Sequence, residues 1–330
     1  MSHRTAPSES TPPSQAFARL VALRFLLCRS RFARHFQLAR ALAAVTLITL
    51  LPRTAAAGDQ ALEAARAQIE QRIAESGAEV AVVFRTLDGK HQLEIRPRDS
   101  FHAASTMKLG VMLELFRQVH AGMLRLDDPL PVRNEFRSVV DGSPFQLDPG
   151  DDSDPDPYAK VGSTMTLREL CEAMITRSSN LATNLLMEKL GIANIRRTVK
   201  ANGGQGLDIV RVLEDGKAFD KGINNTTTAA ALAGLLERVA RGKAVDAASS
   251  EQMVAILKRQ TFNEAIPAGL PPGTPVAHKT GEITKIHHDA AIVYAPRPFV
   301  LVILVREIEQ RDKSSALMAA VTRILYQAEE

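Results

Sequence analysis

The chain has 330 residues, 45% of them apolar and 24% charged, an ordinary globular composition with ample length for a sizeable core. Its net charge is +4, but residues 1–57 alone contain eight Arg, no Lys and one Glu, so the remainder is slightly acidic. The basic character therefore belongs to one terminal segment, and we expect no nucleic-acid partner.

Residues 1–57 have the pattern of an export signal. An Arg-rich stretch ends at Arg40, an apolar run covers 41–51, and the small residues of 54–57 form an A-x-A-like cleavage site. The run is short for a bilayer span, so we predict a secreted or periplasmic protein without stable membrane insertion after cleavage. The alternative is an uncleaved anchor. Cleavage would leave Cys171 as the one cysteine, which we expect to be a buried apolar residue without a disulfide.

The first half of 58–330 begins with a helix over 58–75, followed by strands at 79–86 and 91–96 around the Asp88-Gly89 turn. A helix from about Ser105 to His120 is apolar on almost every side, as buried helices are. The stretch 130–162 is rich in Pro and Asp and predicts a long surface loop. Its acidic run at 148–157 lacks the spacing of an EF-hand loop, and we interpret it as solvated.

Helical patterns follow at 166–177, which begins with a capping box, and at 181–190, 226–241 and 251–259. Residues 207–225 have no clear period and predict a structured loop. Strands at 274–280, 288–294 and 299–306 and a helix at 314–327 end the chain. This order predicts an α+β fold. A five-stranded antiparallel sheet, flanked by the N- and C-terminal helices, forms one lobe (58–115 and 269–330), and an all-helical second lobe spans 116–268.

The predicted helix at Ser105 also carries chemistry in its first turn. Residues three apart share a helix face, so the Ser105 hydroxyl and the Lys108 amine should lie side by side. A buried amine loses part of its preference for the charged form and can act as a base, and a hydroxyl beside a base is an activated nucleophile. The alternative is a core helix with a capping Ser and a Lys whose amine reaches solvent.

Two further motifs follow in order: Ser178-Ser179-Asn180 and Lys279-Thr280-Gly281. Together with Ser105-x-x-Lys108, this trio resembles the motifs of the β-lactamase and penicillin-binding protein superfamily, and most closely the class A β-lactamases. The resemblance covers about 58–330 and includes the segments that lead into each motif. We therefore expect the fold of that superfamily.

The resemblance implies a role for each motif residue. Ser105 would be the acylated nucleophile, Lys108 would accept or relay its proton, and Ser178 would pass a proton to the leaving nitrogen. Asn180 would bind the substrate amide, and the substrate carboxylate would lie against the substrate-binding residues Lys279 and Thr280. Gly281 would let its strand approach the substrate closely, and the backbone N–H groups of Ser105 and Glu282 would form the oxyanion hole.

Deacylation in class A enzymes needs a Glu that activates water, in a loop after the second motif. Glu214 is the nearest candidate and Asp215 the second, although the Asn usually found four residues after the Glu is replaced by Ala218. Two interpretations stay open: Glu214 is the base, or it forms a structural ion pair, for example with Arg211.

Two features near the third motif depart from the resemblance or suggest other chemistry. Glu282 stands where the family usually has a small or hydroxyl residue, and it would narrow substrate choice. His278, His287 and His288 lack a supporting ligand set, so we expect no metal and no cofactor and interpret them as polar strand-end residues.

The resemblance implies a serine β-lactamase that hydrolyses the β-lactam amide through an acyl-enzyme on Ser105. We expect it to be a monomer. The alternative is a D,D-peptidase or a slow β-lactam-binding protein that acts on cell-wall peptide. A working deacylation base distinguishes the two.

Overall fold

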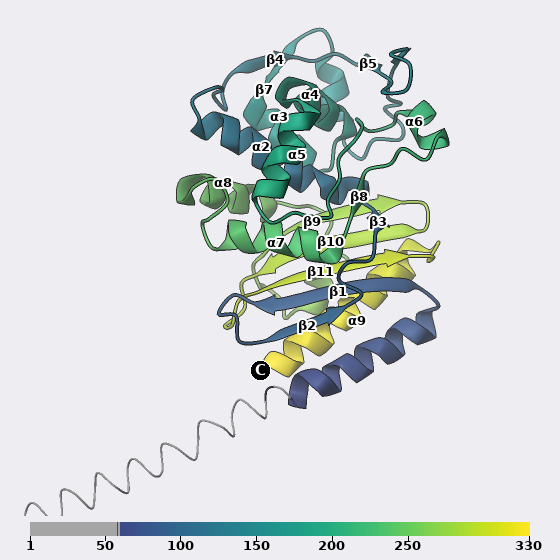
Figure 1. Ribbon diagram of the computed structural model, residues 1–330, viewed down its shortest axis with the longest axis vertical. Helices are drawn as coiled ribbons and strands as arrows, with labels where there is room; N and C mark the ends of the chain where they lie inside the picture. Colours follow the sequence, from purple (N-terminus) through teal and green to yellow (C-terminus); the bar gives the residue numbers. More distant parts are fainter. Residues whose placement is uncertain (1–57, 59) are drawn as a thin grey trace, which may run out of the picture. The chain divides into compact units, whose positions relative to one another are not determined.

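The computed structural model describes residue 58 and residues 60–330, and Gly58–Glu330 forms one compact unit (Figure 1). The predicted export segment, 1–57, lies outside the described residues. Within the described part, none of the helices combines the length and apolarity that a bilayer crossing requires.

A five-stranded antiparallel sheet forms the base of this unit, in the order β2-β1-β11-β10-β9. Its strands are β1 (Glu79–Thr86), β2 (Gln92–Ile95), β9 (Val276–Ile283), β10 (Ile286–Val293) and β11 (Phe299–Arg306). The two chain ends thus build one sheet, as predicted. The bounds of β1 and β11 match the prediction, whereas β9 and β10 both extend to a tight turn in which Ile283 pairs with Ile286.

Both faces of the sheet are buried, which explains the continuous apolar runs of its central strands. Alternate residues of β11 point to opposite sides. Val300 and Val302 join the core shared with the helices, and Leu301 and Ile303 join the core beneath the terminal helices. The sheet is therefore a rigid middle layer.

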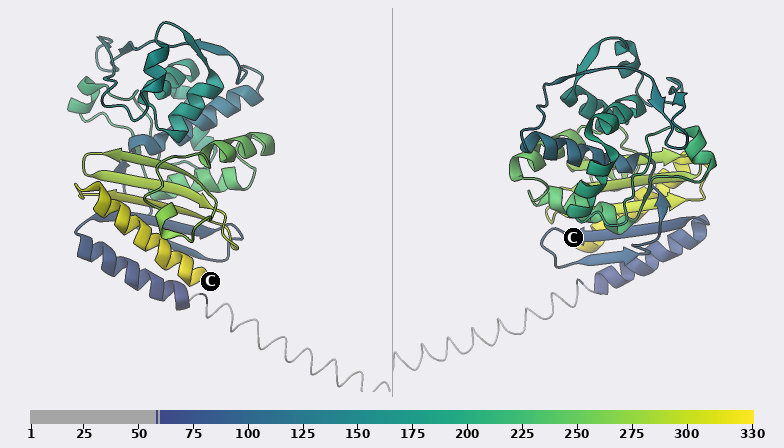
Figure 2. Two further views of the ribbon diagram at one scale, coloured as in Figure 1. Left: turned by 180° about the vertical axis from the view of Figure 1, so that it is seen from behind. Right: turned by 45° about the horizontal axis from the view of Figure 1, so that its top comes forward.

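Two helices from the chain ends cover one face, as Figure 2 shows: a helix over 60–76 and α9 (Arg311–Glu329). Helix α7 (Ala229–Ala240) contacts β1, β10 and β11 from the other side. The helical region above it contains α2 (Lys108–His120), α3 (Leu167–Thr176), α4 (Asn180–Leu190), α5 (Ile192–Ala201) and α8 (Ala247–Leu257). The predicted capping box of α3 is present, from Thr166 to Glu169.

Short elements connect these layers. The two-residue or three-residue strands pair as β3 (Phe101–His102) with β8 (Thr226–Thr227), β4 (Pro129–Pro131) with β7 (Thr164–Thr166), and β5 (Phe136–Arg137) with β6 (Pro144–Phe145). The 3₁₀ helices are η1 (Ala104–Met107), η2 (Asp156–Lys160) and η3 (Pro267–Gly269). Cys171 is fully buried, as expected.

Two local predictions were wrong. The loop at 207–225 contains the short helix α6 (Gly216–Asp220), whose first turn is capped by the Asp215 side chain. The acidic run at 148–157 is not solvated throughout, because Asp152 and Asp154 are buried, with 8% and 1% of their surface exposed. A buried carboxylate needs hydrogen-bond donors or a cation, so these two side chains have partners inside the fold.

Candidate active site

The first and third motifs meet where η1 crosses β9. A Cβ atom added to Gly281 would lie 3.0 Å from both Ser105 N and Thr106 N, so a larger residue would force the strand and the helix apart. The close approach expected of Gly281 is therefore present, but its partner is the backbone of the Ser105 turn.

Ser105 lies in η1, one residue after Ala104, whereas Lys108 begins α2 and is fully buried. The expected pairing of their side chains is not the one observed. Lys108 Nζ donates to Ser178 O at 2.6 Å and to Asn180 Oδ1 at 2.8 Å, and no hydrogen bond joins it to Ser105 Oγ in the described part of the chain. Hydrogen bonds of catalytic groups are often formed only when substrate is bound.

Ser178 joins the second motif to the other two. Its Oγ accepts a hydrogen bond from Lys108 Nζ at 3.2 Å and another from Lys279 Nζ at 3.0 Å. Lys279 is fully buried in β9 and also donates to Thr280 O, while the Thr280 side chain is nearly buried. One residue of each motif thus belongs to a single hydrogen-bond network, Lys108–Ser178–Lys279.

Burial also changes the basicity of both amines. It lowers the pKa of Lys108 to about 7, although the charges of Asp152 and Glu214 act in the opposite direction. Burial and the neighbouring Lys108 charge hold the pKa of Lys279 well below its ordinary value. Near neutral pH, Lys108 can therefore exist as a free base and accept a proton.

Asn180 connects this hydrogen-bond network to Glu214. Its side-chain oxygen accepts from Lys108, and its Nδ2 donates to Glu214 Oε1 at 2.7 Å. Burial raises the pKa of Glu214, and the hydrogen bond from Asn180 opposes that rise. Arg211 instead donates to the backbone oxygens of Ile223 and Val212 and to the Asn224 side chain. The structure therefore gives no support to the predicted ion pair between Glu214 and Arg211.

The backbone on both sides of Glu214 is fixed by buried polar residues. Asn184 of α4 accepts from Leu213 N at 2.7 Å and donates to Leu213 O at 3.0 Å. Asp215 caps α6 and accepts hydrogen bonds from Ser138 Oγ and Val139 N in the loop between β5 and β6. Glu214 is thus held from α4 and from a distant loop.

Three residues at the site have left-handed backbone conformations that side chains other than Gly rarely adopt. Seven such residues occur in the described part of the chain, and they include Ala104 (φ 43°), Ser178 (φ 63°) and Glu214 (φ 60°). Strained conformations of this kind persist where surrounding contacts hold them, and they concentrate at functional sites.

A pocket of about 400 Å³ opens at this place. Four of the predicted residues line it: Ser105, Asn180, Glu214 and Glu282. Lys108, Ser178 and Lys279 are buried and are not among the residues that line it. Other lining residues were missed from the sequence, including His102, Leu213 and Phe219, because they lie outside the motifs in segments without a periodic pattern.

The apolar side chains of Phe219 and Ile283 belong to the mouth of this pocket. They are 56% and 39% exposed, which is unusual for large apolar residues in this molecule. Glu282 also lines the pocket, but its carboxylate lies 2.8 Å from Arg311 Nε of α9. The suggested effect of Glu282 on substrate choice stays a prediction.

The histidines near the third motif have structural partners. His278 Nδ1 lies 3.0 Å from Asp289 Oδ1, and His288 contacts His102 O and Val305 N. All three histidines are buried, His278 within β9 and His287 and His288 at the start of β10. No cluster of three or more His, Cys, Asp or Glu side chains suited to a metal ion occurs among the described residues.

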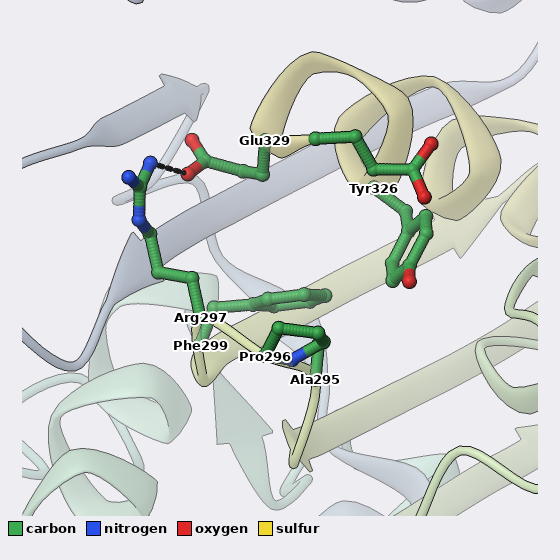
Figure 3. Close-up of a pocket in the computed structure, with 7 residues that line it drawn as sticks. Ala295, Pro296, Arg297, Phe299, Tyr326 and Glu329 are labelled. Carbon is green, nitrogen blue, oxygen red and sulfur yellow. Dashed lines mark hydrogen bonds and ion pairs between the residues drawn. The ribbon is translucent and has the colours of Figure 1, made fainter.

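A second hollow, of about 480 Å³, lies beside the C-terminal helix and contains none of the predicted site residues (Figure 3). Arg297 and Glu329 pair across it at 2.7 Å, and His91 Nδ1 lies 2.9 Å from the same carboxylate. Arg297 and Glu329 thus satisfy each other as a structural ion pair.

Similarity to known proteins agrees with this geometry. A family model described as "Beta-lactamase enzyme family" matches residues 64–328. The chain is 29% identical over 260 residues to β-lactamase AST-1 of Nocardia asteroides, covering 77% of this chain and 80% of that protein. It is 27% identical over 268 residues to the carbapenem-hydrolysing β-lactamase KPC of Klebsiella oxytoca, covering 78% and 85%. The alignment with a Bacillus licheniformis β-lactamase, at 30% identity, spans 57% of that protein, a little over half its length.

Solved structures share the fold. One is a mutant of the reconstructed class A β-lactamase of the last common ancestor of Gram-negative bacteria. It has 28% identity, a TM-score of 0.68, and coverage of 80% of this chain and 98% of that one. Another is PBP-A, with 28% identity, a TM-score of 0.70 and coverage of 80% and 95%. The match of the family model across nearly all of 58–330, with the three motifs joined by hydrogen bonds and by the close contact of Gly281 with the Ser105 turn, shows that this chain belongs to the class A β-lactamase family.

Proposed function

We propose that the chain is a serine β-lactamase that opens the β-lactam amide through an acyl-enzyme on Ser105 and then hydrolyses it. The observation that carries this proposal is the double hydrogen bond of Asn180. Its amide contacts Lys108 Nζ at 2.8 Å and Glu214 Oε1 at 2.7 Å, so the acylation residues and a carboxylate share one site.

Acylation begins when Ser105 Oγ attacks the β-lactam carbonyl and its proton passes to Lys108, whose amine burial leaves partly neutral near pH 7 and so free to accept a proton. The backbone N–H groups of Ser105 and Glu282 stabilise the oxyanion. As the C–N bond breaks, the ring nitrogen takes a proton from Ser178, whose Oγ lies within hydrogen-bond distance of both buried amines. Lys279 and Thr280 bind the substrate carboxylate.

Deacylation requires a base, and Glu214 is the proposed one. Glu214 takes a proton from a water molecule, the hydroxide attacks the ester carbonyl, and Ser105 leaves with a proton returned to its oxygen. The raised pKa of the half-buried Glu214 carboxyl supports this role, because a base works best when its pKa approaches the working pH.

A second candidate function is slow β-lactam binding or D,D-peptidase activity, and the likeness to PBP-A favours it. A PBP-A mutant with 28% identity to this chain is described as an acyl-enzyme complex with penicillin G. Secretion and a monomeric state remain part of the proposal on the basis of the sequence.

The test combines intact-protein mass with absorbance after mixing the mature chain with a chromogenic cephalosporin. Rapid, continuing colour with little trapped adduct is the expected result. A stable adduct on Ser105 with a stoichiometric burst would support the second function instead, and no adduct and no colour would reject both.

A further inference from the structure

The acidic segment at 148–157 has no part in the mechanism above, yet two of its carboxylates are buried against the second motif. Asp152 and Asp154 face the turn from Arg177 to Leu181, where α3 ends and α4 begins. The other three Asp residues of the segment, 148, 151 and 156, are exposed. The two buried side chains therefore have a specific task within the fold.

One carboxylate oxygen of Asp152 accepts several hydrogen bonds from this turn. Its Oδ2 accepts from Asn180 N at 2.8 Å, from Leu181 N at 3.0 Å and from Ser179 Oγ at 3.3 Å. The Tyr158 hydroxyl donates to the same oxygen at 3.0 Å. The first backbone N–H groups of a helix lack partners within that helix, and a carboxylate there also benefits from the positive end of the helix dipole.

Asp154 holds the preceding side of the same turn. Its carboxylate lies 2.9 Å from Arg177 Nε. Ser178, between these anchored residues, has the left-handed backbone that places its Oγ between the two buried amines. The conformation of Ser178 is thus held from both sides by one loop.

The middle residue of the second motif explains why a separate carboxylate is needed. The family pattern is Ser-Asp-Asn, whereas here Ser179 occupies the middle position. Ser179 Oγ accepts from Ala182 N at 3.2 Å and so caps α4, but it carries no charge. The negative charge at the turn comes from another segment of the chain.

The same charge faces Lys108. The charged groups that act on Lys108 are Asp152 and Glu214, which are negative, and Lys279, which is positive. Asp152 is the stronger of the two negative influences on the Lys108 amine. Removing it would favour the neutral amine at lower pH.

We propose that Asp152 is a positioning residue for acylation, which holds the Ser178–Asn180 turn and supplies the negative charge that faces Lys108. This inference rests on the proposed function, because it concerns the rate at which Ser105 becomes acylated. It assigns a role in the site to the acidic segment at 148–157.

The test measures the single-turnover acylation rate of Asp152→Asn with the chromogenic cephalosporin. Samples are quenched at successive times, the adduct is quantified by intact-protein mass spectrometry, and the measurement is repeated from pH 5 to pH 9. The plateau rate should fall on the order of 10-fold or more, because the turn loses an ionic acceptor. The acidic limb of the pH profile, where the acylation rate falls as Lys108 becomes protonated, should move to lower pH by about half a unit or more, because Lys108 loses the negative charge that faces it. Asp151→Asn is the matched control. It removes the same charge from an exposed neighbour and should leave the acylation rate within about twofold.

The double variant Ser179→Asp/Asp152→Asn returns a carboxylate to the turn from within the motif. It should recover most of the acylation rate and move the limb back toward higher pH, and it keeps the test decisive if the single variant does not fold. The inference would be overturned if Asp152→Asn had the acylation rate and the pH profile of the wild type. It would also be overturned if the acylation rate fell, the acidic limb of the pH profile did not move, and the double variant did not recover the rate. If the wild-type chain shows neither an adduct nor colour release in the single turnover, the proposed function itself fails. An adduct in wild type with no effect of Asp152→Asn rejects this inference alone.

Discussion

The residues proposed for acylation and the residue proposed for deacylation are held by different kinds of structure, the former by a buried helix and sheet and the latter by a loop. Lys279 lies on β9 of a sheet buried on both faces, and Lys108 begins a buried helix, so their positions follow from the core. Glu214 lies in a loop and has a left-handed backbone, and its two neighbours are held by hydrogen bonds, Leu213 with Asn184 and Asp215 with Ser138 and Val139. Acylation should therefore tolerate changes in the loop that hydrolysis does not.

Ser105→Ala should have the largest effect, because it removes the nucleophile on which both half-reactions depend. We expect turnover to fall on the order of 10⁶-fold and no covalent adduct to appear, as for other serine hydrolases that lose their nucleophile. Since the change is small, the thermal unfolding midpoint should barely move. Retained turnover with an intact fold would remove Ser105 from the mechanism.

Glu214→Gln separates the two half-reactions. The amide oxygen of Gln can still accept the hydrogen bond from Asn180, so acylation should stay within a few fold, while deacylation should slow on the order of 10³-fold. Intact-protein mass should show an accumulating adduct on Ser105. Unchanged steady-state turnover would mean that another group activates the water.

Lys279→Ala tests the sheet side of the site. The lost amine should lower kcat/KM about 10²-fold for a substrate with a free carboxylate, and much less for its neutral methyl ester. Part of the loss will be common to both substrates, because Lys279 also donates to Ser178. An equal loss for the two substrates would argue against a carboxylate-binding role.

The smallest expected effect is the change in the acylation rate as the pH is varied near neutrality. Lys108 must be neutral to accept the proton, and its pKa of about 7 means that the neutral fraction falls as pH drops below that value. The acylation rate should fall about tenfold per pH unit well below pH 7 and level off above it. Pre-steady-state rates from pH 5 to 9 measure this limb, and a flat profile through pH 6 would contradict the assignment.

The sequence by itself determined the sheet and the order of the three motifs. Strands such as 79–86 and 299–306 are marked by unbroken apolar runs, and Ser105, Ser178 and Lys279 occur in motifs whose residue types are set by acyl-transfer chemistry. Local pattern was sufficient there, because each signal lies within a few neighbouring residues.

The tertiary structure alone decided how those motifs contact one another and what supports them. Asn180 donates a hydrogen bond to Glu214 from its side chain and another to Asp152 from its backbone, and these bonds join residues 34 and 28 positions apart in the chain. An acidic run predicts solvent exposure from its composition, and the burial of Asp152 depends on which donors the fold brings to it. The partner of a buried charge is a property of packing, and no local pattern contains it.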